Sequence, residues 1–215
     1  MTGRTVIIAG ATGLVGREIL QGLLSDPTVA VVHSVGRRPL AIAHPKLMAH
    51  VVDFACLPAL PPADEVYLAL GTTIKVAGSR AAFRAVDYDA NLAVAKAAMA
   101  AGAKKIGLVS AMGADANSKV FYSRVKGELE DALTQLPLMG LVIARPSMLE
   151  GNRAALGQST RRGEAWASAF GKLFGFLIPA NYRPIEAAAV ASALLSAVPS
   201  AKGFQVLLSG VMQQR

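Results

Sequence analysis

A tyrosine and a lysine four residues apart, Tyr122 and Lys126, are the side chains in this sequence best suited to proton transfer. On a helix this spacing places both groups on one face, where the ammonium favours a phenolate. A free tyrosine titrates near pH ~10, so without such help it is a poor acid or base at neutral pH. Ser110, twelve residues before Tyr122, ends an apolar run and adds a second hydroxyl. The pair also fits an apolar helical stripe, so a structural role is the alternative.

A glycine-rich segment near the start of the chain has the context of a dinucleotide-binding turn. It follows the apolar run 6–9 and opens a helical pattern. Its residues are Gly10, Ala11, Thr12, Gly13, Leu14, Val15 and Gly16. Glycines permit the turn and a close approach to a pyrophosphate, and the N-terminus of the helix favours negative charge. A glycine turn that only joins a strand to a helix is the alternative interpretation.

Two arginines indicate which nicotinamide cofactor the chain would prefer. Arg37 and Arg38 follow Gly36 after the second expected strand, where dinucleotide-binding folds contact the adenosine ribose. An acidic residue there would bind the ribose 2′-hydroxyl, whereas arginine suits a 2′-phosphate through charged, bidentate contacts. The pair therefore predicts NADP(H) in preference to NAD(H), with a solvated basic loop as the alternative.

Apolar segments alternate with helical patterns along the chain, which is typical of a parallel sheet with crossover helices. We expect strands at residues 4–9, 29–35, 48–52, 65–70, 105–110, 139–145 and 204–208. We expect helices at residues 14–25, 80–101, 118–135, 161–175 and 185–197. The pattern predicts a Rossmann-like, doubly wound α/β fold with flanking helices and a small C-terminal substrate region.

The carboxyl ends of the expected strands carry further candidate binding residues, because ligands bind at that edge in such folds. Asp53 follows the third strand and is expected to flank the adenine. Leu70, Gly71 and Thr72 close the fourth strand and are expected to reach the phosphates or ribose. Pro146 ends the sixth strand, since proline cannot continue the pairing.

Together these motifs resemble the short-chain dehydrogenase/reductase superfamily, and the glycine spacing is closest to its extended and atypical branches. The resemblance is strongest to the atypical group that includes the Tat-interacting oxidoreductase and its bacterial relatives, over nearly the whole chain. The segments that carry it are Gly10 to Gly16, Leu70-Gly71-Thr72-Thr73, Ser110-Ala111-Met112-Gly113-Ala114, Tyr122-Ser123-Arg124-Val125-Lys126-Gly127-Glu128, Arg145-Pro146 and Arg162-Gly163-Glu164.

The resemblance implies a role for each matching position. NADP(H) would bind at the glycine motif, with the nicotinamide beside Pro146. Ser110 would orient a substrate carbonyl, Tyr122 would act as acid or base, and Lys126 would bind the ribose hydroxyls while favouring the phenolate.

Composition sets broader limits. A chain of 215 residues that is 53% hydrophobic can bury a full core, so we expect one domain over residues 1–215, with residues 147–203 forming a small substrate or lid region. Cys56 is the single cysteine and cannot form an internal disulfide, which led us to expect a cytoplasmic protein. No run reaches the ~18 apolar residues of a membrane span, and the three histidines lack the spacing of a metal site.

The formal net charge of +8 does not by itself indicate nucleic-acid binding. The positive residues occur singly or in pairs, without a basic run or interleaved aromatic side chains. We therefore expect no specific nucleic-acid partner, and a monomer or homodimer that acts on a small molecule.

The sequence favours an NADP(H)-dependent oxidoreductase that reduces a small carbonyl compound. A second hypothesis is a protein that senses NADP(H) and transmits its binding to a partner without turnover. A third is an epimerase or dehydratase acting on a sugar nucleotide, which would need a larger cap than the residues after Pro146 readily supply. Fold alone does not decide among them.

Overall fold

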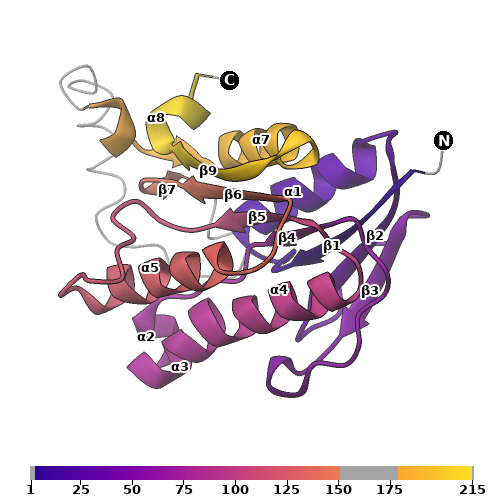
Figure 1. The fold of residues 1–215 in the computed structure, drawn as a ribbon, viewed down its shortest axis with the longest axis horizontal. Coiled ribbons are helices and arrows are strands. Elements are labelled where there is room, and N and C mark those ends of the chain that lie inside the picture. Colours follow the sequence, from indigo (N-terminus) through magenta and orange to yellow (C-terminus); the bar gives the residue numbers. More distant parts are fainter. Residues whose placement is uncertain (1–2, 151–178, 215) are drawn as a thin grey trace.

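The central element is a parallel sheet of seven strands, as the alternation of apolar segments predicts. The computed structural model describes residues 3–150 and 179–214 (Figure 1). The strands of the sheet are β1 (Arg4–Ala9), β2 (Val29–Gly36), β3 (Leu47–Val51), β4 (Glu65–Leu68), β5 (Lys105–Val109), β6 (Gly140–Arg145) and β9 (Gly203–Leu208). All seven expected strands are confirmed, with small differences at their ends.

The order of the strands creates a reversal at the middle of the sheet. The order is β3-β2-β1-β4-β5-β6-β9, and all neighbouring strands are parallel. The chain therefore runs outward from β1 to β3, returns to β4, and continues in the other direction. In open α/β sheets the ligand crevice lies outside the carboxyl ends of the strands at this switch point. Here the switch point lies between β1 and β4.

Helices cover both faces of the sheet (Figure 1). On one face lie α1 (Leu14–Ser25) and α7 (Ala187–Ala197), and on the other lie α4 (Asn91–Ala100) and α5 (Phe121–Thr134). Side chains of β1 alternate between the two cores: Val6 and Ile8 pack toward α1 and α7, and Ile7 and Ala9 toward the opposite helices. This two-sided burial explains the continuous apolar runs of the strands, and each buried Val or Ile contributes about 1.5–3 kcal/mol.

The expected helix 80–101 is interrupted. It consists of α3 (Arg80–Arg84), a π-helical segment at Ala85–Ala90 and then α4. The Asn91 side chain donates to the carbonyl oxygens of Val86 and Asp87, at 3.2 Å each. A polar side chain bonded into the helix backbone in this way is a known cause of irregular turns, which are frequent at functional sites.

Three other element boundaries differ from the sequence expectations by two residues or more. β4 ends at Leu68 rather than residue 70, because the Leu70 carbonyl oxygen accepts a hydrogen bond from the Asn91 side chain instead. α5 begins at Phe121 rather than residue 118, because the Ser118 hydroxyl accepts from Val120 N in a turn before the helix. Residues 185–186 form β8 (Ile185–Glu186), which pairs with β7 (Leu149–Glu150) before α7 begins.

The remaining described elements are short. They are α2 (Ile74–Ala77), α8 (Ser209–Met212) and 3-10 turns at Phe54–Cys56, Ala180–Tyr182 and Val198–Ser200. The expected helix 161–175 and residues 151–178 of the expected lid lie outside the described residues. In the part that is described, no helix has the length and apolar character needed to cross a membrane.

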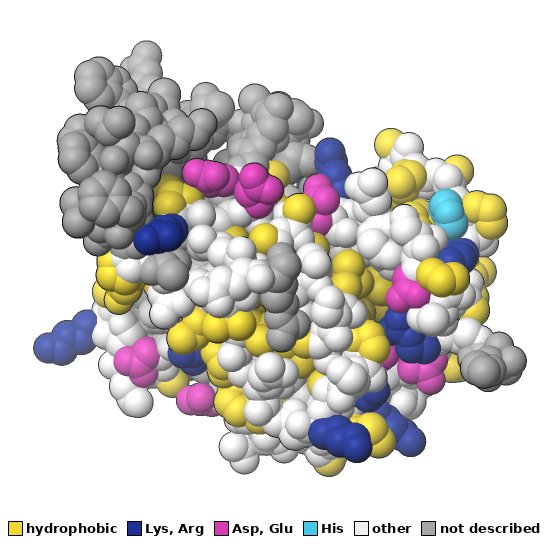
Figure 2. Space-filling view, turned by 90° about the horizontal axis from the view of Figure 1, so that it is seen from above, with side chains coloured by type: hydrophobic (Ala, Val, Ile, Leu, Met, Phe, Trp, Pro, Cys, Tyr) yellow, Lys and Arg dark blue, Asp and Glu magenta, His cyan; other side chains and the backbone are white. Residues whose placement is uncertain are grey.

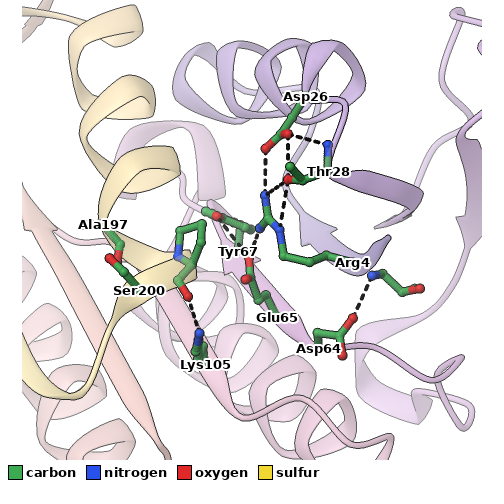
Figure 3. A network of polar contacts seen from close by, with 11 residues as sticks. Arg4, Asp26, Thr28, Asp64, Glu65, Tyr67, Lys105, Ala197 and Ser200 are labelled. Carbon is green, nitrogen blue, oxygen red and sulfur yellow. Dashed lines mark hydrogen bonds and ion pairs between the residues drawn. The ribbon is translucent and has the colours of Figure 1, made fainter. Parts of the chain in front are cut away.

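A polar network stabilises the edge of the sheet where the strands begin (Figure 3). The Arg4 guanidinium pairs with Glu65 and with Asp26, both at 2.7 Å, and also bonds the Thr28 hydroxyl. Glu65 is 2% exposed and accepts from the Tyr67 hydroxyl at 3.4 Å. Burial is the largest cause that raises the pKa of Tyr67 far above its ordinary value, so this hydroxyl stays a donor. The network joins β1, β4 and the α1–β2 turn at the amino edge of the sheet, opposite the carboxyl ends of the strands.

Candidate functional site

The glycine turn between β1 and α1 depends on two of its three glycines for its shape. Gly10 has a φ of 92°, and a Cβ there would lie 2.4 Å from the Ala69 carbonyl oxygen. A Cβ on Gly16 would lie 2.0 Å from the Gly10 carbonyl oxygen. At Gly13 a Cβ would make only ordinary contacts, the nearest at 3.4 Å. Gly10 and Gly16 are thus required by packing, whereas Gly13 leaves the backbone open to a close-lying ligand.

The N-terminus of α1 fits a phosphate group. Gly13 is the N-cap and has no side chain to accept from the first-turn N–H groups, and no acidic residue lies in that turn. The first backbone bond of the helix runs from Arg17 N to Gly13 O at 3.0 Å. Gly13 N donates to Gly10 O at 3.0 Å, and the next three N–H groups, at the positive end of the helix dipole, precede the first bond of the helix and suit an anion.

The two arginines expected at the ribose lie just beyond β2. Arg37 and Arg38 are exposed, and among the described residues neither guanidinium forms an ion pair. Asp53, beyond the end of β3, is exposed and accepts from Ala55 N at 2.9 Å, which caps the short turn that follows. The Val52 N to Gly36 O bond of 2.9 Å keeps the ends of the two strands together. Both candidate positions therefore lie on the same side of the switch point.

Two polar side chains of the interrupted helix form hydrogen bonds with the backbone of the loop after β4. Thr72 N donates to Asp87 Oδ2 at 2.9 Å, and the Asn91 side chain donates to Leu70 O at 3.1 Å. A Cβ on Gly71 would lie 3.6 Å from Asp87 Oδ1 and 3.9 Å from Lys126 Nζ. The loop of Leu70, Gly71 and Thr72 therefore lies directly over the Lys126 ammonium.

Lys126 and Tyr122 occupy successive turns of α5 but have different surroundings. Lys126 Nζ lies 2.8 Å from Asp87 Oδ1, and the two side chains are 5% and 1% exposed. The half-buried Tyr122 ring lies 5.5 Å from the Phe83 ring. Within the described part of the chain the Tyr122 hydroxyl makes no hydrogen bond. The lysine is therefore neutralised by a buried carboxylate, whereas the tyrosine hydroxyl stays unpaired within the described residues.

The Ser110 hydroxyl donates to a second buried carboxylate, that of Glu130. Arg145 Nε lies 3.1 Å from each oxygen of the same carboxylate. The hydrogen bond and charge of Glu130 raise the pKa of Arg145 against the opposing effect of burial. Ser110 N donates to Ala144 O, and Met112 N to Pro146 O, each at 2.8 Å. These bonds place the turn at Pro146 beside Ser110.

The structure thus brings most of the predicted residues to one edge of the sheet and adds others that we did not predict. The additional residues are Asp87, Asn91 and Glu130, which are at most 3% exposed. The Oδ1 atom of Asn91 is buried without a hydrogen-bond partner. The sequence contained a spacing that could have identified these residues. Glu130 continues the four-residue spacing of Tyr122 and Lys126, and Asp87 and Asn91 have the same spacing in an alanine-rich helix.

On the face shown in Figure 2, Lys and Arg side chains lie apart around the rim rather than in one continuous patch. Among the described residues no three His, Cys, Asp or Glu side chains are placed to hold a metal ion. His33 instead lies 3.0 Å from His50, Nδ1 to Nε2, across β2 and β3.

Comparison with known proteins places the chain in a family. A family model described as NAD(P)H-binding matches residues 10–168. The mitochondrial protein FMP52 of Coccidioides immitis (strain RS) is 39% identical over 165 residues, which cover 69% of this chain and 67% of that protein. Proteins of the same name from Emericella nidulans and Lodderomyces elongisporus match 80% and 85% of this chain.

Solved structures share the fold at low sequence identity. An oxidoreductase of the short-chain dehydrogenase/reductase family from Burkholderia thailandensis has a TM-score of 0.69 and 19% identity, covering 100% of this chain and 94% of that one. MoeE5 in complex with UDP-glucose and NAD has a TM-score of 0.70 and 15% identity, covering 94% of this chain and 75% of that one. These similarities establish the Rossmann-like fold.

The expectation of a cytoplasmic protein is wrong by the same comparisons. Four relatives that are 34–39% identical over most of the chain are named mitochondrial proteins. The lone Cys56 excludes only an internal disulfide, and it does not distinguish one compartment without disulfides from another.

Proposed function

Because this chain belongs to the NAD(P)H-binding family, whose model spans residues 10–168, we propose that it is an NADP(H)-dependent oxidoreductase of the short-chain dehydrogenase/reductase type, reducing a small carbonyl compound. One observation carries the proposal. α5 presents Tyr122, whose hydroxyl has no hydrogen-bond partner among residues 3–150 and 179–214, and Lys126, which lies beneath Gly71, at the carboxyl edge that also holds the glycine turn. That edge, at the switch point, is where such folds bind a dinucleotide.

The proposed chemistry assigns each side chain a separate task. Tyr122 donates a proton to the carbonyl oxygen, and Ser110 helps to orient the substrate beside it. Lys126, held by Asp87 under the loop of Gly71, binds the ribose hydroxyls of the cofactor and favours the phenolate that forms. Bound NADPH would supply the hydride. Proton transfer by a positioned side chain typically contributes about 100- to 10,000-fold to the rate.

The proposed preference for NADP(H) rests on Arg37 and Arg38. Both are exposed at the carboxyl end of β2, and neither has an acidic partner among the described residues. Their guanidinium groups are therefore available to a 2′-phosphate, and no carboxylate at these two positions competes for it.

One observation favours a second candidate function. The Asp87 carboxylate neutralises the Lys126 ammonium and so weakens its support for a phenolate. We therefore also propose, as the alternative, a protein that binds NADP(H) without turnover. Binding alone is expected for both candidates, and only a turnover measurement separates them.

The Tyr122→Phe variant tests the catalytic proposal, because it removes one oxygen atom that makes no hydrogen bond to any residue that the structure describes. The experiment first measures the Kd of NADPH by calorimetry, then NADPH oxidation with phenanthrenequinone and p-nitrobenzaldehyde as carbonyl probes. We expect turnover to fall by about 100-fold or more while the Kd of NADPH changes by less than about threefold.

The matched control is Tyr88→Phe, which removes the same atom from a ring that packs against the Arg84 guanidinium, 4.2 Å from Cζ to the ring centroid, and should leave turnover unchanged. Turnover by Tyr122→Phe equal to the wild type would exclude Tyr122 as the acid. NADPH binding by the wild type with no turnover of either probe would favour the non-catalytic alternative.

A further inference from the structure

The interrupted helix and α5 contact each other through side chains at the same spacing, on one face of the sheet (Figure 1). Phe83 and Asp87 lie four positions apart on the first, and Tyr122 and Lys126 lie four positions apart on the second. The Phe83 and Tyr122 rings lie 5.5 Å apart between centroids. Asp87 Oδ1 lies 2.8 Å from Lys126 Nζ. Each member of the proposed proton-transfer pair therefore contacts one side chain of the interrupted helix.

The orientation of the Tyr122 ring depends strongly on Phe83. Among residues 3–150 and 179–214, the Tyr122 hydroxyl forms no hydrogen bond, and the ring stacks on no aromatic side chain other than Phe83. The hydroxyl lies at the far end of the ring from the backbone, so a tilt of the ring displaces it more than any other atom. A displacement of about 1 Å at a reacting group can lower the rate about 100-fold.

Phe83 is itself held on several sides. It is 0% exposed, and its backbone N donates to Ser79 O at 3.0 Å. Its ring also contacts the Phe121 ring, 5.9 Å away and tilted by 58°. The guanidinium carbons of Arg80 and Arg124 lie 5.3 and 5.6 Å from the centroid of Phe121. Rings and cations at these distances attract each other in preferred orientations, so the cluster gives the Tyr122 ring a well-defined surface to pack on.

From this arrangement we infer that Phe83 is a positioning residue for Tyr122: its ring holds the Tyr122 ring at the tilt that directs the hydroxyl toward the substrate carbonyl oxygen. The inference rests on the proposed function, because it adds a residue to the same reaction and no new chemical step. Phe83 and Asp87 then have parallel tasks, since Asp87 holds the Lys126 ammonium.

The test is Phe83→Leu, which removes the ring and keeps an apolar side chain, measured with NADPH and the same two carbonyl probes. We expect kcat to fall by about 10-fold while the KM of each probe changes by less than about twofold. The Kd of NADPH should also stay within about threefold, because the glycine turn and Lys126 are untouched. A kcat within about twofold of the wild type would overturn the inference. A parallel rise in the Kd of NADPH would overturn it too, because the loop after β4 would then have moved.

The matched control is Leu194→Val, which removes buried volume from the core on the other face of the sheet. Both variants lower the free energy of unfolding through lost packing, but Leu194→Val leaves the contacts of Tyr122 intact and should leave kcat unchanged. Equal losses of kcat would make the effect of Phe83→Leu a general result of lower stability and would overturn the inference. If Phe83→Leu does not fold, Phe83→Met replaces it, with the same expected loss.

Fluorine NMR of the protein labelled with 3-fluorotyrosine tests the orientation of the ring without activity. The chain has four tyrosines, and the resonance that is missing from Tyr122→Phe belongs to Tyr122. In Phe83→Leu this resonance should broaden or split, because the ring adopts more than one tilt. The resonance of Tyr67, in the network at the amino edge, should stay in place. A Tyr122 resonance of unchanged position and shape would overturn the positioning role.

Failure of the inference and failure of the proposed function give different results. An active wild type whose kcat is unaffected by Phe83→Leu would overturn the positioning role alone. A wild type that binds NADPH but oxidises it with neither probe would overturn the proposed function and, with it, this role.

Discussion

Single residues at the carboxyl edge of the sheet are organised as two buried ion pairs with hydroxyl groups beside them. Lys126 pairs with Asp87, and Glu130 pairs with Arg145. Removing one partner from such a pair typically costs about 3–5 kcal/mol, because a charge is left buried and uncompensated. Substitutions at these four positions are therefore expected to change both the free energy of unfolding and the activity. Tyr122, Arg37 and Arg38 have no such partners in the described part of the chain, so their variants report on binding and chemistry more directly.

Arg37 and Arg38 are expected to bind the adenosine end of the cofactor. In the double variant Arg37→Ala and Arg38→Ala, the Kd of NADPH should rise by at least about 10-fold, equivalent to about 1.4 kcal/mol. The Kd of NADH should hardly change, because NADH lacks the 2′-phosphate that the guanidinium groups would bind. Calorimetric titration of both cofactors measures the two effects.

Lys104→Ala serves as the control for this charge change. Lys104 is exposed and precedes β5, at the amino edge of the sheet, so both affinities should stay at their wild-type values. Equal losses for NADPH and NADH in the arginine variant would contradict a 2′-phosphate contact and would indicate a general electrostatic effect.

At the scale of elements, the site depends on two irregular pieces of backbone. The turn between β1 and α1 needs glycine where a Cβ would overlap another part of the main chain, and the helix after α3 widens into a π-helical segment. The widened segment carries Asp87, and Asn91 follows it, and together these two hold the loop after β4.

Gly16→Ala and Gly13→Ala separate folding from binding at the glycine turn. Gly16→Ala should lower the free energy of unfolding by about 1–3 kcal/mol, because the new Cβ would meet a backbone oxygen that cannot move alone. Gly13→Ala should change stability by less than about 0.5 kcal/mol yet weaken NADPH binding, because its methyl group occupies the side from which a phosphate would approach.

Urea unfolding followed by far-UV circular dichroism and calorimetric titration of NADPH measure the two effects. Should Gly13→Ala bind NADPH as tightly as the wild type, the pyrophosphate would not lie against this turn. Should Gly16→Ala be as stable as the wild type, the close contact with Gly10 would not be required.

For the molecule as a whole, the two edges of the sheet serve different purposes. The carboxyl edge holds the candidate site, and the amino edge holds the Arg4 network that joins segments distant in the sequence (Figure 3). Burial acts to raise the pKa of Asp26 in that network, but the hydrogen bonds of Thr28 and the charge of Arg4 outweigh it and lower the pKa below its ordinary value.

The lowered pKa of Asp26 predicts an acid-dependent contribution to stability. An acid with a lower pKa in the folded state stabilises the fold above its unfolded pKa of ~3.9, and that stability disappears as pH falls through the folded value. Asp26→Asn should therefore be less stable than the wild type by about 1 kcal/mol at about pH 7, with the difference shrinking toward about pH 3.

Urea unfolding at several pH values measures this difference, and Asp131→Asn, an exposed acid on α5, is the control. A difference between Asp26→Asn and the wild type that stays constant with pH would show that the hydrogen bonds of this side chain matter and its charge does not.

Local pattern was sufficient to predict the layers of the fold and most of the candidate site. The seven strands, the glycine turn and α1 each have a signal within a few neighbouring residues, such as an apolar run or the glycine spacing. In a parallel sheet the carboxyl ends of the strands lie at one edge, so the sequence was enough to place Gly10, Ser110 and Pro146 at that edge. The relative positions of residues within helices followed in the same way, as for Tyr122 and Lys126.

The sequence alone therefore determined the features that depend on neighbouring residues along the chain. These are the strands, most of the helices, the glycine turn and the spacing of the reactive side chains. Only the tertiary structure decided which charges meet. Asp87 and Lys126 are 39 residues apart in sequence (126 − 87), and Ser110, Glu130 and Arg145 come from β5, α5 and β6. A buried carboxylate has no local signature, because its partner is chosen by packing between elements, and packing depends on the whole fold.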